Sequence, residues 1–501
     1  MKKILLFGAG KSATVLIEYL KTIADKNNWN VTVADSSYDN AKTKIGASKN
    51  VVPFEINIEN ELERNELIAN ADIVISLMPP HLHYLIALDC IKYSKNLLTA
   101  SYIDEQTKVL ATQAKEKGIL FLYEMGLDPG IDHLSAMQII HHIHSIGGKI
   151  ISFQSHCGGL VAPESDDNPW HYKISWNPRN VVMAGKAGAT FLKDEKIVTI
   201  SYEDLFNANN LVQLPNAETL TFYPNRDSLS YLDMYGLQGI KTFVRTTLRH
   251  PEFCFGWKNI IDLKLTEEDK VYQTDGMSIA EFLHIHFDRN GFNNWLDEMM
   301  MTRLNKAKDT LEKLMKIMEA EEEAIEEGEE PQETIMMVDE AGMLNTIDVE
   351  AVKENAAEMV ATRMNEANLS MKQLFFLGMD DNITLINKGF CSAADVLQFI
   401  LEQKLVLNNG DKDMIVMLHE IEYEINGKKK TIKSLLRVIG DDSVHTAMAK
   451  TVGLPLGIAA TLILEGKIAE TGLHIPILPS IYQPVLNELK KHNIVFEETT
   501  N

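Results

Sequence analysis

The residues Ile4-Leu5-Leu6-Phe7-Gly8-Ala9-Gly10-Lys11-Ser12-Ala13 place a short apolar run directly before a glycine-rich turn. A continuous apolar run of this length is typical of a strand buried in a parallel sheet. Helical spacing follows to about residue 24, with Leu16 on its apolar face. A second strand at 30–34 then ends at Asp35. The order of strand, glycine turn, helix, strand and acid predicts a dinucleotide-binding unit.

Each small residue in this turn has a place in such a unit. Gly8 makes the turn, and Gly10 lets a pyrophosphate approach the helix N-terminus. Ala13 fills the third small position, where the helix packs on the strand. Lys11 and Ser12 lie in the same turn, and we expect them to contact the cofactor as well.

The acid at the end of the second strand bears on the choice of cofactor. Asp35 can bind both ribose hydroxyls and would repel a 2′-phosphate, which favours NAD. Ser36 beside it could tolerate the phosphate, so NADP stays open. We therefore expect NAD or NADP, with Asp35 favouring NAD.

Alternation of strands and helices continues along the first 130 residues. Further strand patterns stand at 71–76, 96–102 and 119–123, and a helix is predicted at 104–117. This alternation predicts a doubly wound α/β sheet whose strand ends line one crevice. His81 and His83 follow the third strand, and we interpret them as residues at the start of a helix.

A second glycine-rich turn, Glu124-Met125-Gly126-Leu127-Asp128-Pro129-Gly130-Ile131-Asp132-His133, follows the last of these strands. Its position between strand and helix suits a ligand site, and its glycines would let the backbone approach that ligand. A plain Asp-Pro-Gly turn capped by Asp132 is the alternative. Asp128 and His133 are candidates for handling protons, and we favour a supporting role for His133.

Composition limits the class of protein. The chain of 501 residues is long for one core and predicts two or three domains. Its formal charge of −23 argues against nonspecific binding of nucleic acid and against a basic membrane-binding surface. Four scattered cysteines lack metal-ligand spacing, which indicates no metal site and free thiols in a reducing cytoplasm. The apolar run 454–464 is too short to cross a bilayer, so we expect neither a targeting nor a transmembrane segment.

The middle of the chain is rich in groups that bind polar ligands. A strand pattern at 150–156 ends in Cys157-Gly158-Gly159, and residues 167–180 mix aromatic, amide and cationic side chains. Such a mixture suits a polar small-molecule site, although an aromatic-pinned surface loop is the alternative. Arg226, Arg245 and Arg249 suggest a substrate with several carboxylates, while isolated arginines are more often salt-bridge partners.

Long stretches at both ends of the chain resemble saccharopine dehydrogenases of the glutamate-forming type, also called saccharopine reductases. In the first half these stretches are Gly8-Ala9-Gly10, Thr99-Ala100-Ser101-Tyr102, 126–133, Cys157-Gly158-Gly159, 172–176, 223–228 and Thr247-Leu248-Arg249. In the second half they are 412–417 and 446–455.

The resemblance implies NAD(P)-dependent oxidation of the secondary amine of saccharopine, with release of L-glutamate and 2-aminoadipate 6-semialdehyde. It implies that the cofactor contacts the first glycine turn, the end of the second strand, Ile75, Thr99 and Ala100, and we add Leu127. It implies that the substrate contacts Ser101, Tyr102, Asp128, Cys157, Arg226, Thr247, Leu248 and Arg249. Asp128 and Tyr102 are the expected catalytic residues.

Two alternatives remain. A polyamine dehydrogenase of the carboxyspermidine type would act on a substrate with fewer carboxylates, and the pair Arg226 and Arg249 argues against it. A non-catalytic ligand-binding homologue would lose the residues at the amine or the nicotinamide. Asp128, Tyr102 and the glycine turn are all present.

The last third of the chain contains an acidic, methionine-rich stretch at 297–369 and a predicted hairpin at 414–436 with Asn426-Gly427 at its turn. We interpret the acidic stretch as a solvated helical insertion, with an oligomer or partner contact as the alternative. The resemblance implies that a helix within about 441–471 packs back on the dinucleotide domain.

These patterns predict an α/β protein with an N-terminal Rossmann-type doubly wound sheet, an α+β substrate domain with a mixed sheet, and a helical inserted domain. The predicted bounds are 1–128 for the first domain, 129–265 with 411–440 and 472–501 for the second, and 266–410 for the insertion. We further expect a cytoplasmic homodimer.

Overall fold

The computed structural model describes residues 1–207, 210–215, 218–295, 334–338 and 344–501, together with a few positions between 298 and 318. These residues form two compact units. The first contains 1–167, 171–254 and 405–501, and the second contains 168–170 and 255–404. Much of the acidic stretch, including the acid block at 321–330, lies outside the described residues.

The first sheet consists of seven parallel strands in the order β20-β6-β5-β4-β1-β2-β3. The strands are β1 (Lys3–Phe7), β2 (Asn30–Asp35), β3 (Val51–Glu55), β4 (Ile73–Ser76), β5 (Asn96–Thr99), β6 (Leu120–Leu122) and β20 (Gly472–His474). The order 3-2-1-4-5-6 of the first six is that of a dinucleotide-binding sheet, which confirms the predicted doubly wound fold. Two of its strands, β3 and β20, were not predicted.

Helices cover this sheet. They are α1 (Thr14–Asn27), α2 (Tyr38–Ile45), α3 (Glu61–Asn70), α4 (His83–Tyr93), α5 (Glu105–Val109) and α6 (Ala111–Glu116). The single helix predicted at 104–117 is two short helices that meet at Leu110. The first glycine turn continues as a short 3-10 helix, Lys11–Ala13, before α1 begins.

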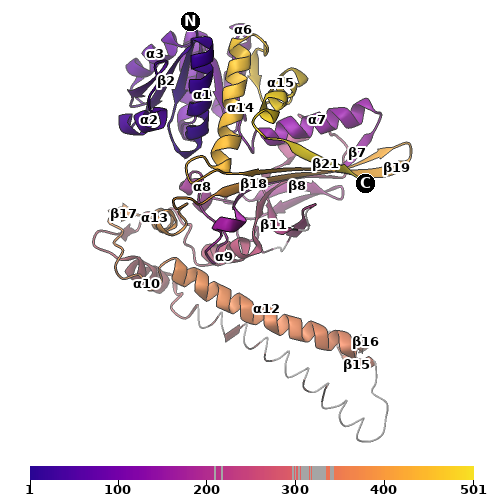
Figure 1. Ribbon diagram of the computed structural model, residues 1–501. Helices are drawn as coiled ribbons and strands as arrows, with labels where there is room; N and C mark the ends of the chain where they lie inside the picture. The colour runs from indigo at the N-terminus through magenta and orange to yellow at the C-terminus, as the bar shows by residue number, and fades with distance from the viewer. Residues whose placement is uncertain are drawn as a thin grey trace, which may run out of the picture. The chain divides into compact units, whose positions relative to one another are not determined.

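Helix α14 (Ala447–Leu464) packs against α1, as the resemblance implied (Figure 1). A Cβ atom on Gly453 would lie 2.9 Å from the backbone nitrogen of Leu16, so only glycine allows the two helices to approach this closely. Among the described helices, α14 alone has the length and apolar composition to cross a membrane, and 78% of that window is buried inside the protein. A helix buried in the core of a protein can have the same length and apolar composition.

The second sheet is mixed and has ten strands, with the path β10-β11-β13-β7-β18-β19-β21. Its strands are β7 (Lys149–Val161), β8 (Ala189–Lys193), β9 (Lys196–Ile200), β10 (Asn210–Gln213), β11 (Thr219–Pro224), β12 (Arg226–Asp227), β13 (Thr242–Arg249), β18 (Asp413–Ile425), β19 (Lys428–Ile439) and β21 (Phe496–Thr500). The hairpin of β18 and β19 turns at Asn426-Gly427, as predicted. Helices α7 (Ile131–Ser145), α8 (Pro178–Val182) and α15 (Pro479–Lys490) belong to the same unit.

The strand predicted at 150–156 is longer than its alternating pattern indicated. Strand β7 continues through Cys157, Gly158 and Gly159 to Val161, where it pairs with β18. A Cβ atom on Gly158 would lie 2.5 Å from the carbonyl oxygen of Leu248. This glycine therefore serves close packing inside the sheet.

The second unit is mainly helical among its described residues, in agreement with the predicted insertion. It contains most of α9 (Pro251–Asp262), then α10 (Ile279–Asn290), α12 (Val349–Phe376) and α13 (Ala393–Lys404). Two small two-stranded sheets, β14 (Tyr272–Gln273) with β17 (Phe390–Cys391) and β15 (Thr334–Val338) with β16 (Leu344–Asp348), complete it. The predicted three-part domain division stays a prediction.

Candidate active site at the carboxyl ends of the first sheet

The turn after β6 folds tightly on itself. The N–H of Gly126 donates to the carbonyl of Pro129 at 2.9 Å, and the N–H of Ile131 donates to the carbonyl of Gly126 at 2.9 Å. Gly130 has φ +148°, and a Cβ atom there would lie 2.0 Å from the oxygen of Gly126. At Gly126 a Cβ atom would lie 2.8 Å from that of Ala100. The expectation that these glycines clear space for a ligand is wrong, because the turn itself occupies the space at Gly130 and Ala100 occupies the space at Gly126.

The turn holds Asp128 against an arginine from the second sheet. Arg245 on β13 donates through its Nη2 nitrogen to Asp128 Oδ1 and to Asp132 Oδ2, at 2.6 Å each. Among the described residues, the other Asp128 oxygen, Oδ2, has no hydrogen-bond partner. The Asp128 side chain is 14% exposed, whereas Asp132 is 2% exposed. Asp128 is therefore the carboxylate that a bound molecule can reach.

The two carboxylates have opposite pKa shifts. Burial raises the pKa of Asp128 to about 6, although the Arg245 charge acts to lower it and the Asp132 charge adds to the rise. Burial also acts to raise the pKa of Asp132, but the charges of His133 and Arg245 and the N–H of Gly130 lower it overall. Asp132 thus stays ionised, and Asp128 can take up a proton near neutral pH.

His133 supports this arrangement from behind. Its ring is fully buried, with Nε2 at 2.8 Å from Glu124 Oε2 and Nδ1 at 2.5 Å from the hydroxyl of Tyr235. Tyr231 donates to the same Glu124 oxygen at 3.0 Å and lies under the Arg245 guanidinium, 4.4 Å from its ring centre. These contacts fit the supporting role that we favoured for His133.

The end of β5 brings Ser101 and Tyr102 to the same edge of the sheet. The backbone N–H of Glu124 donates to the carbonyl of Ser101 at 3.1 Å, which ties this strand end to the turn after β6. The guanidinium of Arg226 lies 5.1 Å from the ring centre of Tyr102. Burial raises the pKa of the Tyr102 phenol, so its hydroxyl is neutral at neutral pH and can donate a hydrogen bond.

Arg249 is a buried cation without a carboxylate. It lies beside the rings of Tyr172 and Phe253, at 5.1 Å and 5.3 Å from their centres. Its Nη1 donates to the carbonyl of Leu248 at 2.8 Å, and its buried Nε has no hydrogen-bond partner. Among the described residues, no acidic side chain forms an ion pair with it. A guanidinium in this state fits the carboxylate of a bound molecule.

The thiol of Cys157 is buried, and the charges of Asp128 and Arg249 both act on it. Cys157 pairs with Thr247 across β7 and β13, and its buried thiol has a raised pKa, first through burial and then through the charge of Asp128. The charge of Arg249 acts on the same thiol in the opposite direction. The neighbouring Leu248 is fully buried in the sheet. A protonated thiol there can pack against a ligand.

The expected cofactor residues gather at the ends of β1, β2, β4 and β5. Gly8 has φ +97°, and a Cβ atom at this position would lie against Leu77. Ala13, just before α1, is buried. A Cβ atom on Gly10 would meet nothing within 4 Å, so open space faces this glycine as a pyrophosphate requires. Lys11 and Ser36 are exposed, and Ser12 is half-buried. Ile75 and Thr99 are buried, Ala100 is half-buried, and Leu127 is 5% exposed.

Asp35 is already placed for a ribose. Its Oδ2 accepts from the N–H of Ala9 at 2.7 Å, and its Oδ1 accepts from the N–H of Ser37 at 3.0 Å. These bonds hold the carboxylate at the first glycine turn. Lys44 is the nearby cation, and its ammonium group donates to the carbonyl of Gly10 and, at 3.0 Å, to the hydroxyl of Thr14.

Several residues at this site did not emerge from the sequence. Arg245 was grouped with the substrate-binding arginines, but it is engaged by two carboxylates of the protein. Its spacing of four from Arg249 on an alternating strand could have placed both on one face. His83 starts helix α4, as interpreted, but the sequence did not indicate that its Nε2 lies 2.7 Å from the Ser101 hydroxyl oxygen. Glu124 gave no sequence signal.

Residues 167–180 divide between two roles. Tyr172 lies under Arg249, as the prediction of a polar site required. Lys173 is instead buried in ion pairs with Asp167 at 2.9 Å and Asp411 at 2.7 Å, which is a structural role.

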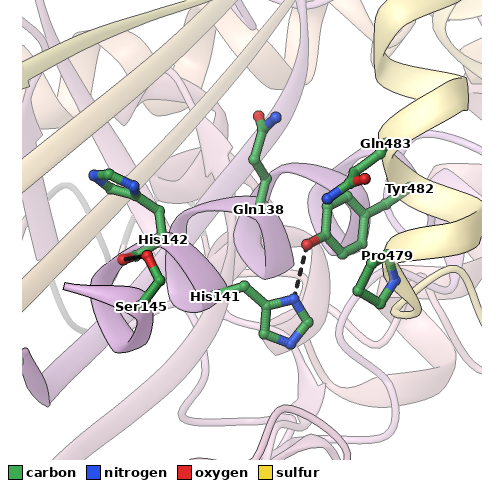
Figure 2. A pocket seen from close by; sticks show the side chains of 7 residues that line it. All are labelled: Gln138, His141, His142, Ser145, Pro479, Tyr482 and Gln483. Carbon is green, nitrogen blue, oxygen red and sulfur yellow. Dashed lines mark hydrogen bonds between the residues drawn. The ribbon is translucent and has the colours of Figure 1, made fainter. Parts of the chain in front are cut away.

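A pocket of about 470 Å³ lies elsewhere, between α7 and α15 (Figure 2). Its lining residues are Gln138, His141, His142, Ser145, Pro479, Tyr482 and Gln483. The Tyr482 hydroxyl lies 2.8 Å from His141 Nδ1. None of the predicted site residues lines it. Among the described residues, no group of three or more His, Cys, Asp or Glu side chains could hold a metal ion.

Comparisons with known proteins agree with this geometry. Residues 4–122 match the saccharopine dehydrogenase NADP binding domain, and residues 126–495 match the saccharopine dehydrogenase C-terminal domain. A saccharopine dehydrogenase [NADP(+), L-glutamate-forming] of Saccharomyces cerevisiae is 30% identical over 503 residues, which cover 100% of this chain and 99% of the relative. A mitochondrial alpha-aminoadipic semialdehyde synthase of Bos taurus is 31% identical over 99% of this chain, which spans only 47% of that relative.

Solved structures extend the comparison. Apo saccharopine dehydrogenase (L-Glu forming) from Saccharomyces cerevisiae superposes with a TM-score of 0.77 at 27% identity, with 100% of both chains covered. A homospermidine synthase from Legionella pneumophila in complex with NAD shares the fold at a TM-score of 0.52 and 8% identity, covering 100% of this chain and 91% of that one. The two matched domains span nearly the whole sequence in the expected order. The chain therefore belongs to the saccharopine dehydrogenase family.

Proposed function

We propose that this protein is an oxidoreductase that acts on a CH–NH group, a saccharopine dehydrogenase that forms L-glutamate and 2-aminoadipate 6-semialdehyde in lysine metabolism. The name of the yeast relative, which this chain matches over its full length, supports the reaction. The observation that carries the proposal is Arg249, a buried guanidinium whose Nε has no hydrogen-bond partner among the described residues. It follows Arg245, which binds Asp128, by four residues on strand β13, so the two arginines share one face of the strand. Saccharopine has carboxylates and a secondary amine, which Arg249 and Asp128 complement.

Asp128 is the proposed base. Saccharopine arrives with a protonated amine, and oxidation requires its lone pair. Asp128 Oδ2 takes a proton from the ammonium group, so that an N–H bond breaks and an O–H bond forms. Asp128 is suited to this step because burial raises its pKa to about 6. Tyr102 remains a neutral hydrogen-bond donor in the same site.

The arginines hold the substrate in one orientation. Arg249, which lies beside Tyr172 and Phe253, binds one carboxylate, and Arg226, which lies over Tyr102, binds another. Ser101 and Thr247 offer hydroxyls to the remaining polar atoms. Fixing both ends of the substrate aligns its reacting carbon with the cofactor. A water molecule then adds to the imine carbon, and glutamate leaves as the amine.

The residues of the first glycine turn fit a dinucleotide. Gly10 faces open space, and Asp35 is held at the turn by two backbone N–H groups. When bound, the nicotinamide cofactor accepts the hydride. The matched domain and the fungal relatives carry NADP in their names. Asp35 supports NAD instead, because a carboxylate beside the 2′-position repels a phosphate. We propose that this chain uses NAD in preference to NADP.

Two further parts of the proposal concern the whole molecule. We propose a homodimer, for which light scattering of the purified protein is the test. A cytoplasmic location is proposed because all four cysteines are free and buried.

Absorbance of the reduced nicotinamide tests the reaction. Purified protein with saccharopine and either cofactor should raise this absorbance, and carboxyspermidine in place of saccharopine should not. A faster rate with carboxyspermidine would favour the polyamine alternative, which the fold of the homospermidine synthase accommodates. No rise with either substrate would favour a non-catalytic homologue.

A further inference from the structure

Arg245 lies at the centre of the charged groups behind the candidate base. Its side chain is 4% exposed, and one nitrogen, Nη2, donates to Asp128 and Asp132 at equal distances of 2.6 Å. The Nε nitrogen of Arg245 is buried and has no hydrogen-bond partner. The guanidinium therefore meets both carboxylates through a single nitrogen rather than through the paired contacts of a bidentate ion pair.

The second carboxylate is held independently of Arg245. Asp132 Oδ1 accepts from the N–H of Gly130 at 2.5 Å, and Asp132 Oδ2 lies 3.6 Å from His133 Nδ1. Asp132 is thus fixed at the start of α7 by its own turn. Among the residues that the structure describes, Asp128 has Arg245 as its hydrogen-bond partner, through Oδ1, and its Oδ2 has none.

Two acids that share one cation each receive less stabilisation than either would alone. We propose that Asp132 is a positioning residue that competes with Asp128 for Arg245, and that this competition keeps Asp128 basic enough to take the proton of the substrate amine. Without Asp132, Arg245 would pair with Asp128 alone and make it a poor base. This role rests on the proposed function of the site.

Tyr231 contacts Arg245 through its ring, and among the described residues Asp128 and Asp132 are the carboxylates that pair with Arg245. Other titratable groups also lie near Asp128. Those groups are Glu124 at the end of β6, His133 on α7, Tyr102 beyond β5, Cys157 on β7, and Tyr235 after β12. None of the substitutions proposed below replaces any of these groups.

Two substitutions should move the acid limb of the pH profile in opposite directions. Asp132→Asn keeps an oxygen for the Gly130 N–H but removes the competing charge. The acid limb of kcat/KM should then shift down by about one pH unit, because Asp128 holds its proton less tightly. Arg245→Met leaves two carboxylates without a cation, and the limb should shift up by at least about one unit.

A conservative variant and a matched control separate this role from simple damage. Arg245→Lys keeps a cation between the two carboxylates and should restore most of the wild-type profile. Arg437→Met removes an arginine of β19 that pairs with Glu218 on the same sheet, and its profile should match the wild type. A merely structural role would lower activity in the variants without moving the limb in opposite directions.

The carboxyl pKa can also be measured without turnover. ¹³C NMR of protein with labelled aspartate carboxyls, with the Asp128 signal assigned through Asp128→Asn, gives its titration directly. The same opposite shifts are expected there. A titration that does not move in Asp132→Asn, or that moves upward, overturns the proposal. Loss of saccharopine oxidation in the wild type with the opposite shifts intact would instead count against the proposed function.

Discussion

The Nε2 nitrogen of His83 lies 2.7 Å from the hydroxyl oxygen of Ser101, just beyond the end of β5. The other ring nitrogen lies 2.9 Å from the Ser76 hydroxyl, at the end of β4. His83 therefore links the ends of two neighbouring strands and fixes the hydroxyl that we expect to meet the substrate. Burial lowers the pKa of His83 to about 4, so the ring is neutral at physiological pH.

Removing this ring should weaken substrate binding. His83→Ala leaves the Ser101 hydroxyl free to rotate, and we expect kcat/KM for saccharopine to fall by about tenfold, the worth of one hydrogen bond. His83→Gln, whose amide can reach Ser101, should recover part of the loss. The exposed His81 is a matched control, and His81→Ala should behave as the wild type. Equal losses at both histidines would contradict the role of His83.

Arg249 should be more important for activity than for stability. A buried cation without an ion pair costs free energy in the unliganded protein, so Arg249→Met should leave Tm unchanged or raise it. The same change should lower kcat/KM for saccharopine by at least about tenfold, because the carboxylate loses its partner. Saccharopine should raise the Tm of the wild type and not that of the variant. A lower Tm with unchanged KM would contradict this account.

Asp35 should control the choice of cofactor. Asp35→Asn retains an oxygen for one of the two backbone N–H groups and loses the charge that repels a 2′-phosphate. We expect the ratio of kcat/KM for NADP to that for NAD to rise by about tenfold. Asp72→Asn, at the opposite end of the sheet where Asp72 accepts from Lys3, is the control. An unchanged ratio in Asp35→Asn would remove the basis for a preference for NAD.

An ion pair at the start of α14 should make stability depend on pH. His445 Nε2 lies 2.9 Å from Glu18 on α1, and its Nδ1 lies 3.0 Å from Asp442. Its hydrogen bonds to Asp442 and Glu18 raise the pKa of His445. A raised pKa means that this stabilisation is complete below the unfolded value near 6.5 and is lost as pH rises above it.

The comparison of wild type with His445→Ala tests this link. Because the pair is partly exposed, the difference in free energy of unfolding should be less than about 1 kcal/mol at pH 6 and should shrink by pH 8. Urea titrations at the two pH values measure it. A difference that grows with pH would show that the charged imidazole does not stabilise the fold.

Local patterns were sufficient to predict the first sheet and its glycine turn. The run from Ile4 to Asp35 carries the strand, turn and helix signals in sequence, and the structure places them as predicted. The two strands at the edges of this sheet were harder to predict from the sequence. Strand β3 contains Pro53 and is half exposed, while β20 has three residues and joins the sheet from the far end of the chain. Such short or distant strands have little periodicity to detect.

The site was predicted in its residue types but not in its pairings. Asp128 was predicted from its place in the second glycine turn, Arg249 from the affinity of arginine for carboxylates, and both from the resemblance. That Arg245 would pair with Asp128 depends on strand β13 meeting the turn after β6, which are 117 positions apart in the chain. A local sequence pattern cannot predict a contact between residues that are so far apart in the chain. The prediction for the glycines of the turn was wrong for a related reason, since the atoms that require them belong to Gly126 in the folded turn and to Ala100 after strand β5.

The most direct test of the account is the stoichiometry of the proposed reaction. Purified protein is incubated with saccharopine and NAD or NADP, and reduced cofactor and free glutamate are quantified together. The account predicts one glutamate for each cofactor reduced, at a rate at least about a hundredfold lower in Asp128→Asn. Cofactor reduction without glutamate, or no reduction with either cofactor, would contradict it.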